Sequence, residues 1–388
     1  MSAPKVRLTS LPAVFVRAGT SKGLLFHQRD LPADRQAWAP LFLAAMGSPD
    51  PYGRQLDGMG GGLSSLSKVC VIGPSSRPDA DVDYTFAQVL IKESLVDFQP
   101  LCGNMSAAIG PFAVDEGLVP VNGDSATVRI HNTNTGKIIV SSFPVLEGCT
   151  RLDGDLAIPG VAGTGAPVRL DFLDPGGAST GRLLPTGLVR ETLDVPGVGR
   201  IEASLVDASN ACVFVRAADL GLSGTEMPTR IEEDADLMRA LGAIRLAASI
   251  RMGLAADAQE AARRTAVPFV GFVAPPADWT TLSGEAVSGQ EADLSARVLS
   301  NGQPHRALPL GVSMCLAVAA RIEGTVVHQV SRPATALGAD LRLGMPSGVL
   351  RVAADVVSGE TGWQARRGSF YRTQRRLFEG RVRVPLPA

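Results

Sequence analysis

Short apolar segments, rich in valine, leucine and threonine and separated by glycine and proline, recur along the whole chain. Segments of this length and composition, bounded by turn residues, predict β-strands. In the first half we expect strands over residues 14–16, 24–27, 68–72, 83–91, 95–98, 127–131, 137–143 and 168–172. In the second half we expect strands over residues 200–206, 211–215, 269–273, 350–357 and 364–372, followed by a basic tail.

Four longer segments predict helices, over residues 34–46, 102–116, 232–252 and 310–322. In the second of these, Met105, Ile109 and Phe112 recur at helical spacing, and Gly117 follows as a C-terminal stop. Pro111 lies inside this segment and is expected to kink or shift the helix, because proline has no backbone N–H to donate. The third segment is amphipathic, with one apolar face formed by Leu237, Leu241, Ile244 and Ala248.

The order of elements repeats, so that each half holds a central apolar helix among antiparallel strands. We therefore predict an α+β protein of two domains, since 388 residues are enough for two hydrophobic cores. The N-terminal domain is expected over residues 1–184 and the C-terminal domain over residues 185–388. The last strand is a candidate to cross back onto the N-terminal domain.

Charge and composition exclude several classes of protein. The 37 basic and 38 acidic residues are evenly scattered and give a net charge of −1, so neither nucleic acid nor an anionic membrane surface is an expected partner. No apolar stretch approaches the roughly 20 residues that span a bilayer. The start of the chain lacks the pattern of a secretory signal, and a cytoplasmic location is expected.

The cysteines and histidines indicate neither a disulfide framework nor a metal site. The five cysteines form no CxxC pair, and their odd number favours reduced thiols. The four histidines are too dispersed for a zinc motif of the HExxH kind. Chemistry by ordinary side chains, with no metal and no cofactor, is therefore the hypothesis to pursue.

Lys68 and Cys102 are the candidate catalytic residues. Cys102 stands at the start of a predicted helix, where unpaired N–H groups and the helix dipole favour a thiolate. Lys68 follows a glycine- and serine-rich run and leads into an apolar strand, so burial would favour its neutral amine, a usable base. A thiol and an amine can donate and accept protons, and this pair points to isomerisation by proton transfer.

Several further residues are candidates for binding a negatively charged substrate. The segment 58–62 superficially matches a dinucleotide fingerprint but lacks its strand–turn–helix context, so an anion-binding backbone nest is the better interpretation. Helix starts and arginine side chains also suit carboxylates. The candidates are Ser21, Lys22, Gly60, Gly61, Ser64, Ser67, Gly103, Asn104, His305 and Arg306, with Asn210 as a more distant one. For each, a purely structural role in a turn or strand stays open.

Long motifs along nearly the whole chain resemble those of the 2-methylaconitate cis-trans isomerase family, the PrpF-like proteins. The family also contains 4-oxalomesaconate tautomerases or Δ-isomerases and 3-methylitaconate Δ-isomerases. The resemblance lies in residues 17–23, 46–51, 55–61, 67–69, 81–84, 102–104, 110–113 and 134–137, and more weakly in 184–187, 273–276 and 346–348. It implies a diaminopimelate-epimerase-like fold of two similar domains, each a central helix wrapped by antiparallel sheet, with the active site between them. It also implies that Lys68 and Cys102 act around a substrate double bond.

The resemblance leaves three functions to weigh. The first is a cofactor-independent isomerase that moves or rotates a C=C bond in a small unsaturated di- or tricarboxylate, either by cis–trans rotation or by a 1,3-allylic shift; residues 49–52 favour an aconitate-like substrate. The second is a non-enzymatic accessory protein to an iron–sulfur dehydratase. The third, a two-thiol amino-acid epimerase, is disfavoured because residues 310–311 at the second helix start contain no cysteine. Association of two copies as a homodimer stays open.

Overall fold

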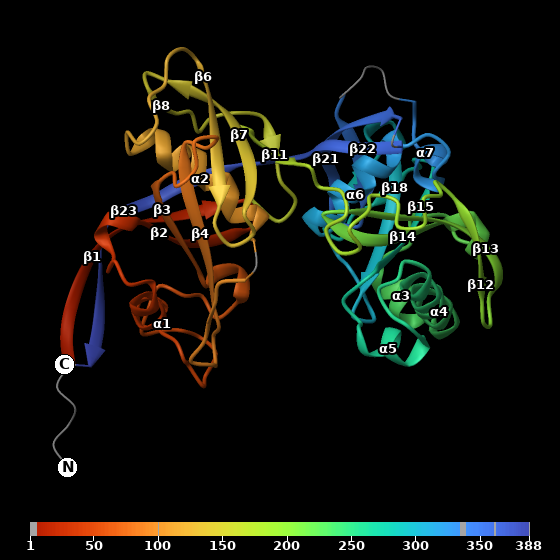
Figure 1. Ribbon diagram of the computed structural model, residues 1–388, viewed down its shortest axis with the longest axis horizontal. Helices are drawn as coiled ribbons and strands as arrows, with labels where there is room; N and C mark the ends of the chain where they lie inside the picture. Colours follow the sequence, from red (N-terminus) through yellow and green to blue (C-terminus); the bar gives the residue numbers. More distant parts are fainter. Residues whose placement is uncertain (1–5, 100, 334–338, 361, 388) are drawn as a thin grey trace. The chain divides into compact units, whose positions relative to one another are not determined.

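The protein divides into two compact units, one comprising Met1–Asp171 with Tyr371–Ala388 and the other Phe172–Phe370. The computed structural model describes residues 6–99, 101–333, 339–360 and 362–387. In both units, runs of mainly antiparallel strands are separated by a few helices, and this confirms the predicted α+β class (Figure 1). Strands β11 (Val168–Leu173) and β22 (Gly362–Arg372) span the points at which the chain passes from one unit to the other.

Unit 1 is built on paired strands around two helices. Strand β1 pairs antiparallel with β2, β2 parallel with β3, β3 antiparallel with β4, β4 parallel with β6, and β6 antiparallel with β7. The bounds of its elements are β1 (Val6–Ala18), β2 (Ser21–His27), α1 (Trp38–Met46), β3 (Lys68–Pro74), β4 (Val82–Val89), β5 (Val96–Asp97), α2 (Gly103–Asp115), β6 (Ser125–Asn132), β7 (Lys137–Leu146), β8 (Cys149–Thr150), β9 (Leu156–Ala157), β10 (Thr164–Gly165) and β23 (Gln374–Pro387).

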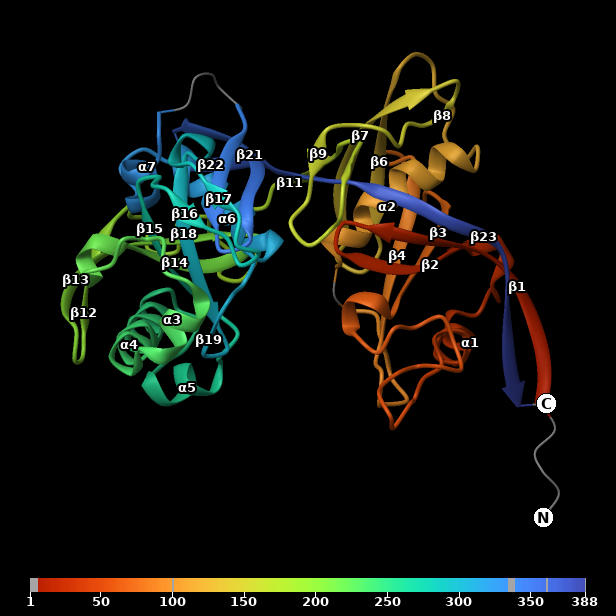
Figure 2. The ribbon, with the colours of Figure 1, turned by 180° about the vertical axis from the view of Figure 1, so that it is seen from behind.

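Helix α2 packs against β1, β6 and β7, and it also contacts β2 and β3 (Figure 2). Each residue from 105 to 114 is buried, and this burial matches the predicted apolar character of the segment. Helix α2 continues through Pro111 to Asp115. On another part of the unit, α1 packs its apolar face against the sheet, with the rings of Phe26 and Phe42 stacked at 5.8 Å.

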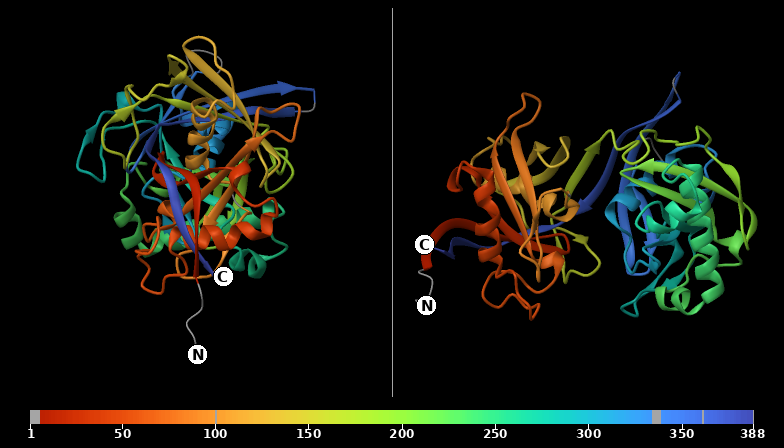
Figure 3. Two further views of the ribbon diagram at one scale, coloured as in Figure 1. Left: turned by 90° about the vertical axis from the view of Figure 1, so that its left-hand side faces the viewer. Right: turned by 60° about the horizontal axis from the view of Figure 1, so that its bottom comes forward.

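The segment expected to be a basic tail is instead the long strand β23. It pairs antiparallel with β1 from one end to the other, from Val6 opposite Pro387 to Ala18 opposite Gln374. The first and last described residues therefore lie side by side, and the left panel of Figure 3 draws the two strands, red and blue, next to each other. The segment from Tyr371 onward is thus part of unit 1, although it is last in the sequence.

In unit 2, β13 pairs antiparallel with β14, β14 parallel with β15, β15 antiparallel with β18, β18 parallel with β20, and β20 antiparallel with β21. Its elements are β12 (Glu191–Val195), β13 (Gly199–Ala208), β14 (Asn210–Arg216), α3 (Pro228–Glu233), α4 (Ala235–Arg251), α5 (Ala258–Arg263), β15 (Phe269–Ala274), β16 (Trp279–Thr280), β17 (Ala286–Val287), β18 (Leu294–Ser300), β19 (Gln303–Pro304), α6 (Leu310–Arg321), α7 (Val326–Val330), β20 (Leu341–Met345) and β21 (Gly348–Gly359).

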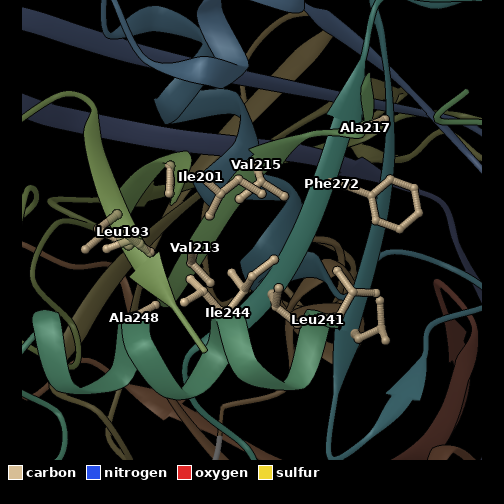
Figure 4. Packing of buried hydrophobic residues seen from close by; sticks show 14 of the residues in the cluster. Leu193, Ile201, Val213, Val215, Ala217, Leu241, Ile244, Ala248 and Phe272 are labelled. Atoms are coloured by element: carbon tan, nitrogen blue, oxygen red, sulfur yellow. The ribbon is translucent and has the colours of Figure 1, made fainter. Parts of the chain in front are cut away.

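The helix predicted over residues 232–252 is α4, which begins at Ala235, and a separate short helix, α3, precedes it. Asp234 ends α3 and caps α4, because its side chain accepts a hydrogen bond from the backbone N–H of Leu237. The predicted apolar face of α4 is buried: Leu241, Ile244 and Ala248 point toward the strands in Figure 4 and pack in one core with Val213 and Phe272. Burial of this stripe stabilises the helix on the sheet.

Candidate active site

Lys68 opens β3 with its side chain nearly buried, at 8% exposure. Its backbone lies between Gly23 of β2 and Gln88 of β4. The Nζ atom donates a hydrogen bond of 2.6 Å to Oε1 of Gln88 and lies 5.1 Å from the ring centroid of Phe86. The predicted burial of this amine is therefore present, and it occurs beside a neutral acceptor and an aromatic ring.

Cys102 is the N-cap residue of α2 and is partly exposed. Its carbonyl oxygen accepts hydrogen bonds from the backbone N–H and the hydroxyl of Ser106, at 3.0 and 2.9 Å. The thiol accepts no hydrogen bond from the first-turn N–H groups, so the side chain of Cys102 does not cap the helix. The first-turn N–H groups and the positive end of the helix dipole lie beside it.

A buried thiol and phenol lie near both candidate groups. Sγ of Cys70 on β3 is 3.8 Å from the hydroxyl of Tyr84 on β4. Burial raises the pKa of Cys70, a negative charge on Cys102 raises it further, and the positive charge of Lys68 lowers it. Burial likewise raises the pKa of Tyr84. Cys70 lies two residues from Lys68 on the same face of β3, and α2, whose N-cap is Cys102, contacts β3, so the two candidate catalytic side chains belong to one neighbourhood of unit 1.

Arg372 brings a positive charge to the same neighbourhood. It is 6% exposed, and its Nε donates to Oδ1 of Asn104 at 3.0 Å, in the first turn of α2. Burial lowers the pKa of Arg372 to about 10, while a negative charge on Cys102 favours its protonated form. The guanidinium therefore stays charged at neutral pH.

Asn104 also ties the hairpin between β1 and β2 to the helix. Its Nδ2 donates to the Thr20 hydroxyl at 3.1 Å. Gly19, at φ +52°, packs so closely that a Cβ there would lie 2.2 Å from Oδ1 of Asn104 and 2.9 Å from Cδ of Arg372. The hairpin, the helix start and the returning C-terminal segment thus form one tightly packed corner.

The glycine-rich loop is organised around the buried side chain of Gln55. Its Oε1 accepts hydrogen bonds from the backbone N–H of Gly62 at 3.0 Å and from the Ser67 hydroxyl at 2.6 Å. Gly60 packs on this amide, where a Cβ would lie 2.3 Å from Oε1. Ser67 is fully buried, so its hydroxyl serves the loop, whereas Gly61 is exposed.

The other candidate binding residues fall in different places. Ser21 opens β2 and is buried, and Lys22 is partly buried with its Nζ 6.0 Å from the Phe15 ring centroid. Ser64 is an exposed residue of a 3₁₀ turn (Ser64–Leu66) ahead of Lys68. Gly103 is the first residue of α2, next to Cys102.

His305 and Arg306 belong to unit 2. Nε2 of His305 lies 2.8 Å from the Ser300 hydroxyl, and burial lowers the pKa of this imidazole. Arg306 is exposed. Asn210 lies against the first turn of α6, where a Cβ on Gly311 would lie 2.5 Å from its Nδ2.

Gln88 and Arg372 are the residues that sequence reasoning missed. Gln88 lies in the strand predicted over residues 83–91, so pairing that strand with 68–72 would have placed it opposite Lys68. No sequence signal connects Arg372 with Asn104, because 268 residues separate them.

Within the described ranges, no group of three or more histidine, cysteine or acidic side chains could hold a metal ion. The helices of the described chain are all too short or too polar to cross a membrane.

Comparison with known proteins gives one consistent result. The family model described as PrpF protein matches residues 8–385. Over 376 residues, 96% of this chain and 97% of the relative, the chain is 42% identical to 3-methylitaconate isomerase of Eubacterium barkeri. It is 39% identical to 2-methyl-aconitate isomerase of Shewanella oneidensis over 387 residues, 97% of each chain. It is 36% identical to 4-oxalomesaconate tautomerase of Pseudomonas putida over 374 residues, 96% of each.

A solved structure shares the fold. The crystal structure of methylitaconate-delta-isomerase has a TM-score of 0.90 with this protein at 41% identity, covering 97% of this chain and 96% of that one.

Proposed function

The chain belongs to the PrpF family and is an isomerase, and from this premise we propose that it moves or rotates a C=C bond in a small unsaturated di- or tricarboxylate. The observation that supports this most is the buried amine of Lys68 in one neighbourhood with the thiol of Cys102. The named relatives act on methylitaconate, methyl-aconitate and oxalomesaconate, which share this chemical class.

In the proposed reaction the neutral Lys68 removes a proton from a C–H bond next to a carboxylate or keto group. The electron pair of that bond delocalises into a dienolate, and Lys68 becomes an ammonium. Cys102 then gives a proton to the other allylic carbon and becomes a thiolate. Return of a proton to the original carbon after bond rotation would give cis–trans isomerisation instead, and the intermediate is common to both outcomes.

The negative charge of the dienolate needs oriented donors, which are usually the largest contribution to such catalysis. In unit 1 the start of α2 offers backbone N–H groups at Gly103 and Asn104, and Arg372 adds a fixed positive charge. We propose that these groups, with the predicted binding residues Ser21 and Lys22, face the substrate. His305 and Arg306 remain proposed substrate-binding residues of unit 2.

We further propose that each unit is one domain of the diaminopimelate-epimerase-like type. The strand pairings of unit 1, from β1 to β7, follow the same order of antiparallel and parallel pairs as those of unit 2, from β13 to β21. On this correspondence, the N-cap residue of α2 is Cys102 and that of α6 is Pro309. A second thiol at that position is therefore absent, which argues against two-thiol racemisation.

Proton NMR in deuterated buffer tests the proposal. Wild type, Lys68→Met and Cys102→Ser are incubated in turn with cis-aconitate, trans-aconitate, methylitaconate and 4-oxalomesaconate. Exposed Lys92 and Cys149 provide matched controls, as Lys92→Met and Cys149→Ser. We expect wild type and controls to interconvert one substrate with deuterium uptake, and Lys68→Met to lose about a hundredfold or more of the rate.

Undiminished exchange in Lys68→Met would exclude Lys68 as the base. Absence of exchange with all four compounds, in folded wild-type protein, would favour the accessory role for an iron–sulfur dehydratase over catalysis on this substrate class.

A further inference from the structure

Gln88 is the side chain that holds the amine of Lys68. The two residues face each other across the antiparallel pair of β3 and β4. Oε1 of Gln88 accepts the hydrogen bond from Nζ at 2.6 Å, and Phe86, two residues earlier on the same strand, places its ring 5.1 Å from Nζ. Alternate residues of a strand share a face, so the amine rests on a surface formed by Phe86 and Gln88.

The amide of Gln88 is held in one orientation. Its Nε2 donates to the backbone oxygens of Ser64 and Ser67, both at 3.0 Å, and to that of Val89 at 3.3 Å. A flipped amide would place Oε1 against these oxygens and remove the hydrogen bonds that Nε2 makes to them, which is unfavourable for partly buried groups. The turn before β3 therefore fixes which end of the amide faces Lys68.

We propose that Gln88 is a positioning residue for Lys68, an inference that rests on the proposed function of Lys68 as the base. An amide oxygen only accepts hydrogen bonds, so a neutral amine directs one N–H toward Gln88 and its lone pair elsewhere. The same oxygen accepts from the ammonium that forms when Lys68 takes a proton. Since the amide carries no charge, it orients the amine without holding it permanently protonated, as a carboxylate at this distance would.

The test compares the pH dependence of kcat/KM in Gln88→Glu, Gln88→Met and wild type on the substrate found by the NMR assay. Glutamate keeps the size of the side chain and adds a negative charge beside Nζ, so the acid limb should move upward by about one to three pH units. Its second oxygen replaces the NH2 group that donates to Ser64 and Ser67, so a lower melting temperature is also expected. Methionine removes the acceptor and should lower kcat by about tenfold to a hundredfold, with KM little changed and no upward movement of the limb. Gln36→Glu makes the same charge change at an exposed side chain of the same unit and should behave as wild type.

Thermal melting checks that each variant is folded. If Gln88→Met does not fold, the pH dependence of Gln88→Glu alone tests the positioning role. An unmoved acid limb and an unchanged kcat in folded Gln88→Glu would overturn the positioning role. Lys68→Met, measured in parallel, separates the two hypotheses: an inactive Lys68→Met with a normal Gln88→Glu refutes only the role of Gln88. An active Lys68→Met refutes the function of Lys68 itself.

Discussion

Replacing Gly19 with alanine tests how strongly the start of α2 depends on the hairpin between β1 and β2. Gly19 has φ +52°, in the left-handed region, and its backbone N–H donates to the Thr373 carbonyl at 2.9 Å. An alanine Cβ would lie 2.2 Å from Oδ1 of Asn104 and 2.9 Å from Cδ of Arg372. At least one of these side chains must therefore move.

The expected cost has two parts. The left-handed backbone costs a non-glycine residue about 1–2 kcal/mol. Displacement of Asn104 removes its hydrogen bonds to the Thr20 hydroxyl and to the Arg372 guanidinium. These are worth about 1 kcal/mol for the neutral bond and about 1.5–3 kcal/mol for the charge-assisted one. We expect Gly19→Ala to lower the free energy of unfolding of unit 1 by about 3.5–6 kcal/mol, and to lower kcat/KM by disturbing the residues next to Cys102.

Gly136 offers a matched control in the same unit. It lies in the hairpin between β6 and β7 at φ +69°, with nothing within 4 Å of an added Cβ. Gly136→Ala should therefore cost only the backbone part, about 1–2 kcal/mol. The difference between the two variants isolates the contacts at the start of α2.

Urea unfolding followed by tryptophan fluorescence measures both costs. The chain has three tryptophans, and Trp38, which is buried, is the one in unit 1. In a Trp279→Phe, Trp363→Phe background the emission reports this unit alone. Equal destabilisation by Gly19→Ala and Gly136→Ala, with unchanged kcat/KM, would refute the reasoning.

Three further predictions concern the core, the pH dependence and the thiols. Leu241→Ala, in the fully buried face of α4, should destabilise unit 2 by about 2–5 kcal/mol in urea unfolding while exposed Leu282→Ala does not. Burial alone would raise the pKa of Glu116, but the hydrogen bonds from His27 and Arg376 outweigh it and lower that pKa. The ionised Glu116 therefore stabilises the fold at pH values above 4.5, its ordinary pKa, and this stabilisation is lost as the pH falls through the lowered pKa. The free energy of unfolding should decline less steeply in acid in Glu116→Gln than in wild type. Parallel plots of stability against pH for the two proteins would contradict this. Alkylation followed by mass spectrometry should modify Cys149 and Cys102 in the native protein and leave Cys70, Cys212 and Cys315 unmodified until urea unfolds it; early labelling of a buried thiol would count against the described packing.

The sequence was sufficient for most strands and for the central part of α1, α2, α4 and α6, because periodic burial of apolar residues is a local property of the chain, whereas the short helices α5 and α7 were not predicted. It placed the starts of α2 and α6 at positions 102–103 and 310, and it selected Lys68 and Cys102 from their neighbours alone. It was less accurate at helix ends, as at Asp234, whose capping hydrogen bond to Leu237 starts α4 three residues after the predicted start.

Only the tertiary structure decided which other groups surround Lys68 and Cys102. The alternating apolar residues Val382, Val384 and Leu386 favour a strand in the C-terminal segment, but only the tertiary structure pairs that strand with β1 and brings Arg372 to Asn104. Ser67 looks like a binding hydroxyl in the sequence, but its burial against Gln55 commits it to the loop. Gln88 faces Lys68 only because β3 and β4 pair in one register. Local sequence determines which side chains are chemically able to react, whereas long-range pairing determines their charge environment and their hydrogen-bond partners.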